Sequence, residues 1–237
     1  VRRGRIEEQI VPGPGVYFRA VPLPEKMGAL AFEMGLNIPV ALRTYNQLIL
    51  HAGVVGNQHG GVIISAASGS GKSTLTALLM EEGFRLFSDE FGIVDTESLQ
   101  LVPYPRPISL KNASIDVVRD MSGAEWISPV VEGSPKGSIA YRRARKSDLE
   151  NDQKRVPPKL VLFPTFEKGS ISSMKKMETA DTVMRLIESS TNYQIMGEAA
   201  FQAVNQIAKN ATAFEITYGS SDEALKLFKT VADEIGL

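Results

Sequence analysis

The sequence predicts an α/β fold in which a mixed sheet is flanked by helices, with a small β-containing segment on its N-terminal side. Short runs of Val, Ile, Leu and Phe, typical of buried strands, alternate with stretches of helical periodicity. One such run leads into small residues and glycines and then directly into a helical stretch. The 237 residues are 43% hydrophobic and 22% charged, which suits one substantial core. We expect an N-terminal segment without an assigned role over residues 1–45 and one main domain over residues 46–237.

Composition excludes several classes of function. The net charge is −1 and no long basic block occurs, so we expect no binding to nucleic acid or to an anionic membrane. Cysteine is absent, which removes disulfides and thiolate metal sites and fits a reducing cytosol. No apolar run reaches the roughly 20 residues of a membrane span, and the beginning of the sequence lacks the apolar core of a signal peptide. We therefore expect a soluble, cytoplasmic protein.

The N-terminal part of the sequence predicts a strand, a helix and a hairpin, in that order. Val16–Val21 alternates like a strand, and Glu25–Met34 is compatible with a short helix. Leu48–Val55 is a strong strand candidate, and the turn Gly56–Gly61 leads from it into the next apolar run as a hairpin. This hairpin would place His51 on the strand beside the glycine-rich loop. A histidine on an apolar strand is either a hydrogen-bonded core residue or, in this position, a functional one.

The glycine-rich loop has the features of a phosphate-binding P-loop. Gly69 and Gly71 let the backbone turn tightly and bring its N–H groups close to an anion. Ser73–Glu81 then has leucines and alanine at helical spacing, so the last amides of the loop would lie at the positive end of a helix. We predict that the phosphate-binding residues are Ser68, Gly69, Ser70, Gly71, Lys72, Ser73 and Thr74.

The consensus G-x-x-x-x-G-K-[ST] places a lysine on the terminal phosphates and a hydroxyl on Mg²⁺. In this chain Lys72 and Ser73 occupy those places, whereas Ala66 replaces the first glycine, so the match is to the S-G-x-G-K-S core. The alternative interpretation is a glycine-rich turn with a surface lysine. The strand before the loop and the helix after it favour phosphate binding.

Two carboxylates follow the next predicted strand, Phe84–Phe87. Ligands of open α/β sheets bind beyond the carboxyl ends of the strands, so Asp89 and Glu90 would face the phosphates. Asp89 would act either as the base that takes a proton from an acceptor hydroxyl or as a metal ligand. Glu90 is either a second metal-site carboxylate or a surface acid that begins the next hairpin, Phe91–Val94 with Leu99–Val102.

The middle of the chain is harder to interpret. Arg106 in a proline-rich extended stretch and Lys111, at the end of a predicted strand that begins at Ile108, would contact phosphate or lie on the surface as a pair. Residues 113–155 show a mixed polar pattern and predict an irregular substrate loop. The basic run Arg142–Lys146 in this region would be a solvated loop or a site for an acidic peptide or a triphosphate.

The C-terminal part predicts alternating strands and helices. Lys159–Pro164 reads as a buried strand, and Thr179 would cap a helix that runs to Ser189. A second helix is expected over Gly197–Lys209, followed by the strand Ala213–Tyr218. Ser221 would cap a final helix through Asp233.

Three segments together resemble a known family: Leu50–Gly53, Ser68–Ser73 and Gly83–Glu90. Their order and spacing are similar to those of the HPr serine kinase/phosphorylase family, and more closely to its HPr-kinase-related kinases. Further stretches resemble the second group in particular: Pro105–Lys111, Pro157–Pro164 and Tyr218–Gly219. The resemblance covers residues 46 to 230 or so and implies a P-loop kinase core of the HPr-kinase type. It also allows a homo-oligomer, because the classical relatives are hexamers.

The resemblance implies roles for individual residues. Lys72 and Ser73 would hold the phosphates of ATP and Mg²⁺, and Asp89 would take the proton from the acceptor serine. His51 occupies the place of the histidine that supports this acid. The chain departs from the classical enzymes in having Thr74 where they have an acid, and Glu90 where they have a second aspartate. Their C-terminal signature for the phosphorylase reaction is not found.

The leading hypothesis is an ATP- and Mg²⁺-dependent kinase that transfers the γ-phosphoryl group to a serine hydroxyl on a peptide or small protein. One alternative is a kinase for a small molecule such as free serine. Another is a non-catalytic nucleotide-binding switch or partner-binding module, which Ala66 and Thr74 would suit.

Overall fold

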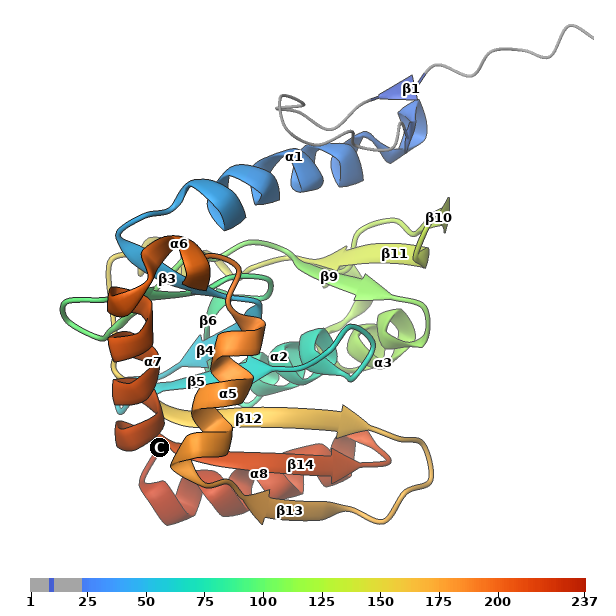
Figure 1. Cartoon of the computed structure of the whole chain (residues 1–237). Helices are drawn as coiled ribbons and strands as arrows, with labels where there is room; N and C mark the ends of the chain where they lie inside the picture. The colour runs from blue at the N-terminus through green and yellow to red at the C-terminus, as the bar shows by residue number, and fades with distance from the viewer. Residues whose placement is uncertain (1–8, 11–22) are drawn as a thin grey trace, which may run out of the picture.

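A computed structural model of the chain describes residues 9–10 and 23–237, and it has a six-stranded mixed sheet at its centre (Figure 1). The order across this sheet is β13 (Ser173–Lys176), β14 (Thr212–Tyr218), β12 (Pro158–Phe166), β5 (Gly61–Ser65), β4 (Ala52–Gly56) and β6 (Arg85–Ser88). β5, β12 and β14 are parallel, whereas β4 runs antiparallel to both β5 and β6. The carboxyl ends of β5, β6, β12 and β14 therefore lie at one edge, together with the start of β4.

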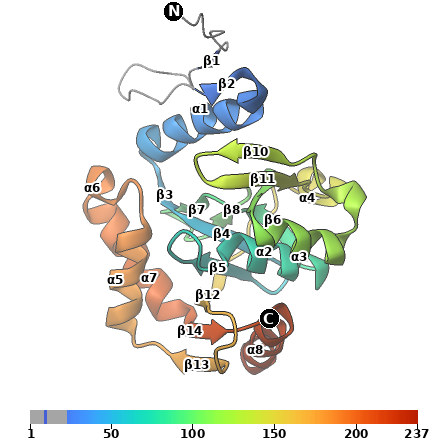
Figure 2. The same cartoon turned by 90° about the vertical axis from the view of Figure 1, so that its right-hand side faces the viewer.

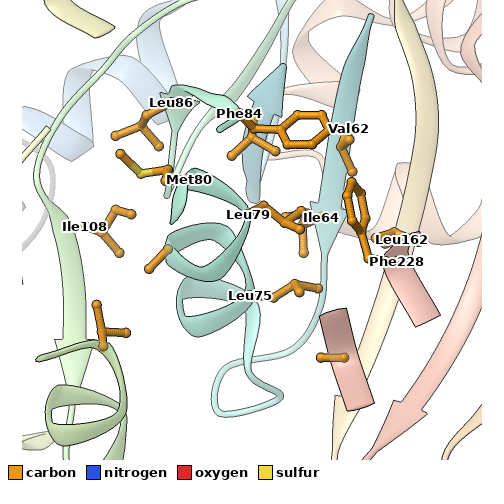
Figure 3. Packing of buried hydrophobic residues seen from close by; sticks show 14 of the residues in the cluster. Val62, Ile64, Leu75, Leu79, Met80, Phe84, Leu86, Ile108, Leu162 and Phe228 are labelled. Atoms are coloured by element: carbon orange, nitrogen blue, oxygen red, sulfur yellow. The ribbon is translucent and has the colours of Figure 1, made fainter. Parts of the chain in front are cut away.

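Helices cover both faces of this sheet, as the prediction of a mixed sheet flanked by helices requires (Figures 1 and 2). One face carries α2 (Lys72–Glu81), α3 (Ala113–Ser122) and α8 (Ser221–Ile235). The other face carries α5 (Thr179–Ser189), the short α6 (Tyr193–Met196) and α7 (Glu198–Asn210). Each face has its own buried apolar cluster, and Figure 3 shows one of them, to which Leu75 and Leu79 of α2, Ile64 of β5 and Phe228 of α8 belong.

Smaller sheets extend this core. β3 (Gln47–Leu50) pairs with β7 (Gly92–Asp95), which pairs with β8 (Leu101–Val102). β9 (Ile108–Lys111) pairs with β11 (Gly137–Arg142), and β11 pairs with β10 (Val131–Ser134). At the N-terminal side, β1 (Gln9–Ile10) pairs with β2 (Leu23–Pro24), and a single turn of 3₁₀ helix, η1 (Glu25–Met27), leads into α1 (Gly28–Arg43). No helix within the described ranges is both long enough and apolar enough to cross a bilayer.

The N-terminal predictions are partly corrected. The strand predicted over Val16–Val21 lies outside the described residues. The helix expected over Glu25–Met34 is longer, because α1 continues through Pro39 to Arg43. Its middle is held by tertiary contacts, since Glu33 accepts a hydrogen bond from Tyr141. Figure 2 shows α1 lying beside β10 and β11.

The strand predicted over Leu48–Val55 is two strands in different sheets. β3 ends at Leu50 and β4 begins at Ala52, with His51 between them. The side-chain amide of Asn192 holds β3 in place, because it accepts a hydrogen bond from the Ile49 amide at 3.0 Å and donates to the Gln47 carbonyl at 2.8 Å. The apolar run alone does not show this break, since both strands are buried.

The prediction of an irregular loop over residues 113–155 is wrong. This region contains α3, the 3₁₀ turn η2 (Ala124–Trp126), β10, β11 and α4 (Lys146–Glu150). Its polar residues conceal regular structure because many of them pair with one another. Arg145, for example, donates to the main-chain carbonyls of Met80 and Phe84 and forms an ion pair with the buried Asp148. The basic run Arg142–Lys146 is therefore structural at Arg142 and Arg145 and not a solvated loop.

Two predicted helix caps are displaced by one residue. Helix α5 has Glu178 at its N-cap position, and Thr179 is its first helical residue. Helix α8 is capped by Ser220, whose hydroxyl accepts a hydrogen bond from the Glu223 amide at 3.3 Å. Before α8 two consecutive serines, Ser220 and Ser221, are both suitable caps, so local sequence alone does not select between them.

Arg142 gives a stability prediction. Its side chain is buried, and its guanidinium pairs with Glu81 of α2 and donates to the Arg143 carbonyl at 2.6 Å. Removing one partner of a buried ion pair costs about 3–5 kcal/mol. Glu81 is partly solvated here, so we expect Arg142→Met to lower the free energy of unfolding by about 2–3 kcal/mol in urea titrations. The neighbouring exposed Arg143→Met is the control, and equal losses in the two variants would contradict this role.

Candidate functional site

Three chain segments meet at the carboxyl edge of the central sheet. The loop after β5 runs into α2 at Lys72, the chain leaving β6 reaches Asp89 and Glu90, and His51 immediately precedes β4. Because β4 is antiparallel to both of its neighbours, its start lies at the same edge as their ends. The strand order thus brings together residues that lie far apart in the sequence.

The glycine-rich loop has the backbone that a phosphate cradle needs. Gly69 and Gly71 both have a φ of 89°, a conformation that side chains disfavour. A Cβ at Gly71 would also lie 2.6 Å from the Tyr218 hydroxyl and 3.2 Å from the Phe166 Cβ. Gly71 is the N-cap of α2, and no side chain caps this helix. Its first N–H groups are therefore free to bind an anion.

Lys72 and Ser73 connect the loop to Asp89. The Lys72 ammonium is buried and donates to the main-chain carbonyl of Asp89 at 2.6 Å. The Ser73 hydroxyl donates to Asp89 Oδ2 at 2.9 Å. The two side chains that the sequence assigns to phosphate and Mg²⁺ thus converge on the acid that follows β6.

Asp89 is buried, with 2% of its surface exposed. Burial raises its pKa, against the opposing charge of Lys72 and the hydrogen bond from Ser73. Its Oδ1 atom is also buried and has no hydrogen-bond partner among the residues that the structure describes. An unpaired buried carboxylate oxygen is costly, so this atom marks a place where a positively charged or donating group would bind.

The donor set fits Mg²⁺ held together with phosphate. Mg²⁺ takes oxygen ligands and commonly uses one or two carboxylates plus substrate phosphates and water. Ser73 Oγ and the unpaired Oδ1 of Asp89 are oxygens of this kind. Within residues 9–10 and 23–237, no cluster of three or more His, Asp or Glu side chains is arranged to hold a metal ion by itself. A cation here would therefore depend on the oxygens of a bound phosphate.

His51 contacts Glu90, whereas the expected support of Asp89 by the imidazole stays a prediction. Its Nδ1 lies 3.4 Å from Glu90 Oε2, and the two side chains are 42% and 19% exposed. Glu90 is thus the acid that lies within ion-pair distance of the imidazole. Burial, and secondly the charge of Lys72, lowers the pKa of His51, partly offset by Glu90. The His51–Glu90 pair is the more exposed part of the site.

Arg106 contacts helix α1. Its guanidinium donates to Asn37 Oδ1 at 2.6 Å and lies 3.7 Å from Glu33 Oε1. The rings of Phe91 and Tyr104 lie 5.7 and 5.4 Å from it. These contacts do not test the predicted role in phosphate binding, but they show that the N-terminal segment reaches the site.

Glu33 extends the group of charged residues around the acids. It accepts a hydrogen bond from the Tyr141 hydroxyl at 2.7 Å, and burial raises its pKa, with the charges of Glu90 and Asp89 adding to the effect. The positive charge of Lys111, at the end of β9, lowers the pKa of His51. Sequence reasoning missed Glu33, because a single acid in a weakly periodic helix carries no local signal.

The remaining predicted residues fall into two groups. The loop and the first turn of α2 contain Ser68, Gly69, Ser70, Gly71, Ser73 and Thr74 together, as expected for one phosphate site. His59 lies apart in the turn between β4 and β5, where it is exposed and contacts Gln58. Sequence reasoning singled out neither Phe166 nor the Tyr218 hydroxyl, both of which border Gly71.

The raised pKa of Asp89 predicts a trade-off between stability and function. A carboxylate with a raised folded-state pKa destabilises the fold progressively as the pH rises above 3.8, the ordinary aspartate value, and the loss is complete above the folded pKa. We therefore expect Asp89→Asn to unfold at a higher temperature than the wild type at pH 7. The gain should disappear in acid, below pH 3.8. Thermal scans over this pH range test the prediction, and a lower Tm at pH 7 would contradict it.

No family model matches the chain, and no curated protein matches it. Among solved structures, it is similar to the Hpr(Ser) kinase/phosphatase from Coxiella burnetii, with 13% sequence identity and a TM-score of 0.36. The alignment covers 78% of this chain and 95% of that chain. The interpretation of the site therefore rests on its own geometry.

Proposed function

We propose that this protein is a nucleotide-dependent phosphotransferase, an ATP- and Mg²⁺-dependent kinase. The observation that carries the proposal is the convergence of Lys72 and Ser73 on the buried Asp89 beside an uncapped helix start. Phosphoryl transfer depends mainly on alignment and on neutralising charge on the transferred group. The loop amides, the Lys72 ammonium and the Ser73–Asp89 pair are groups that can align the phosphates and neutralise their charge.

The two acids would divide the work between the donor and the acceptor. Asp89 is nearly inaccessible and already bonded to Ser73, so it suits the side of the donor phosphates. Bound Mg²⁺ would add charge neutralisation there. Glu90 is more exposed and lies against His51, so it suits the acceptor side, where a base must come within hydrogen-bond reach of a hydroxyl. This assigns the base role to Glu90 instead of Asp89.

The proposed acceptor is a serine hydroxyl on a peptide or small protein. The partly exposed His51–Glu90 pair supports an acceptor that approaches from solvent. Free serine would present the same hydroxyl on a smaller molecule. A nucleotide-binding switch would use the loop but would not need a general base such as Glu90.

The test is transfer from γ-labelled ATP in the presence of Mg²⁺, with a mixture of serine peptides, with free serine, and without an acceptor. We expect label on the peptides. Label on free serine alone would indicate the small-molecule kinase, and ATP binding without transfer to any of these acceptors would indicate the switch. A chain that binds neither ATP nor tripolyphosphate would overturn the proposal.

A further inference from the structure

The phosphate loop has a second neighbour on the side opposite the acids. In the central sheet, β6 and Asp89 lie to one side of β5, whereas β12 and β14 lie to its other side. Phe166 is the last residue of β12 and Tyr218 is the last residue of β14. Both aromatic residues therefore border the loop on the side away from Asp89, which is where we look for the nucleoside of a nucleotide whose terminal phosphates lie at Lys72 and Asp89.

Phe166 is an exposed aromatic residue attached to the loop. Its amide donates to the Ser70 carbonyl at 3.2 Å, and its Cβ would lie 3.2 Å from a Cβ at Gly71. Its side chain is nevertheless 45% exposed. A large apolar ring held at the rim of a polar loop leaves one surface available for another flat apolar group.

The ring of Tyr218 packs against the ring of Phe166. The two ring centroids are 5.9 Å apart, with the planes at 54°. Tyr218 is only 3% exposed, and its hydroxyl, 2.6 Å from the place of a Cβ at Gly71, has no partner among the described residues. A buried hydroxyl without a partner, directed at the underside of the loop, is unusual for a residue that serves packing alone. The pair is therefore a built feature of the loop and not a chance exposure.

We propose that Phe166 is the platform on which the base of the nucleotide stacks, with Tyr218 as a positioning residue that holds the Phe166 ring. This inference rests on the proposed function and adds to it the part of the site that recognises the nucleoside. Base–aromatic stacking is worth about 1–3 kcal/mol per base by alanine substitution. A bare polyphosphate has no base to stack on this ring, so the platform would distinguish it from a nucleoside triphosphate.

The experiment compares ATP with inorganic tripolyphosphate, each with Mg²⁺, by calorimetry on the full chain. We expect Phe166→Ala to raise the Kd for ATP roughly 5- to 150-fold and to leave the Kd for tripolyphosphate unchanged. The control is Phe201→Ala on α7, a phenylalanine of similar exposure, 48%, on the opposite face of the sheet. It should change neither affinity.

A second variant keeps an aromatic ring at position 166 and allows ligand binding there to be followed by fluorescence. The chain has one tryptophan, Trp126, so Phe166→Trp adds a reporter ring at the site. We expect this variant to keep its affinity for ATP and to change its emission with ATP but not with tripolyphosphate. Equal weakening of both ligands by Phe166→Ala, or no weakening, would overturn the platform and leave the phosphate site intact. If the wild type binds neither ligand, the proposed function fails and the platform fails with it.

Discussion

Replacement of Lys72 by methionine is expected to lower the rate of phosphoryl transfer by about 10²- to 10³-fold, the usual effect of removing one donor that stabilises transition-state charge. Lys72 is 7% exposed and points to the Asp89 carbonyl at the end of the phosphate loop. Methionine keeps an apolar stem of similar length, so the buried volume is retained while the charge and the donors are lost. ATP affinity should fall as well.

This experiment separates chemistry from folding. Lys209→Met, at an exposed position near the end of α7, is the matched control and should leave both transfer and ATP affinity unchanged. Circular dichroism and thermal scans should show that Lys72→Met remains folded, because its one hydrogen bond is to a main-chain carbonyl. Wild-type transfer in Lys72→Met would remove the phosphate loop from the mechanism.

The second large effect concerns the two acids. Glu90→Gln is expected to lower the transfer rate by roughly 10²- to 10⁴-fold, the usual contribution of a positioned acid–base group. ATP affinity should change little, because Glu90 contacts His51 and not the loop. Asp89→Asn should lower both the rate and the Mg²⁺-dependent part of ATP affinity, since Asp89 is bonded to Ser73.

Single-turnover rates and Mg²⁺-dependent ATP titrations of the two variants test this assignment. Both substitutions remove one charge and keep the side-chain shape, so each serves as the control for the other. The reverse pattern would return the base role to Asp89: normal transfer in Glu90→Gln, together with lost transfer but normal ATP binding in Asp89→Asn.

The conformation of the glycine-rich loop is predictable from sequence because its determinants are local. A buried strand, two glycines with positive φ and a helix start follow one another within a few residues, and each is specified by its own residue types. The same holds for β9, for the hairpin of β7 and β8, and for the C-terminal helices to within a residue or two. Residues 113–155 are wrongly predicted to be irregular, because buried pairs such as Arg145 with Asp148 make a folded segment appear polar.

The sequence predicts that the two acids and the histidine lie near the loop, but it does not predict which of these side chains contact one another. Strand order brings His51 to the end of β6, where its imidazole contacts Glu90. Likewise, helix α1 reaches Arg106 across about 70 residues of chain, a separation at which no local pattern gives a signal.

The residue types at the loop and at the strand ends are thus enough to indicate phosphate chemistry, because backbone conformation and hydrogen-bonding capacity belong to each residue. Which acid is buried, which one contacts the imidazole, and which aromatic ring borders the loop depend on neighbours that meet only when the sheet forms. The pKa of Asp89 depends on its burial and on neighbouring charges, and the exposure of Phe166 depends on which segments pack around it. Neither property can be predicted from a short stretch of sequence.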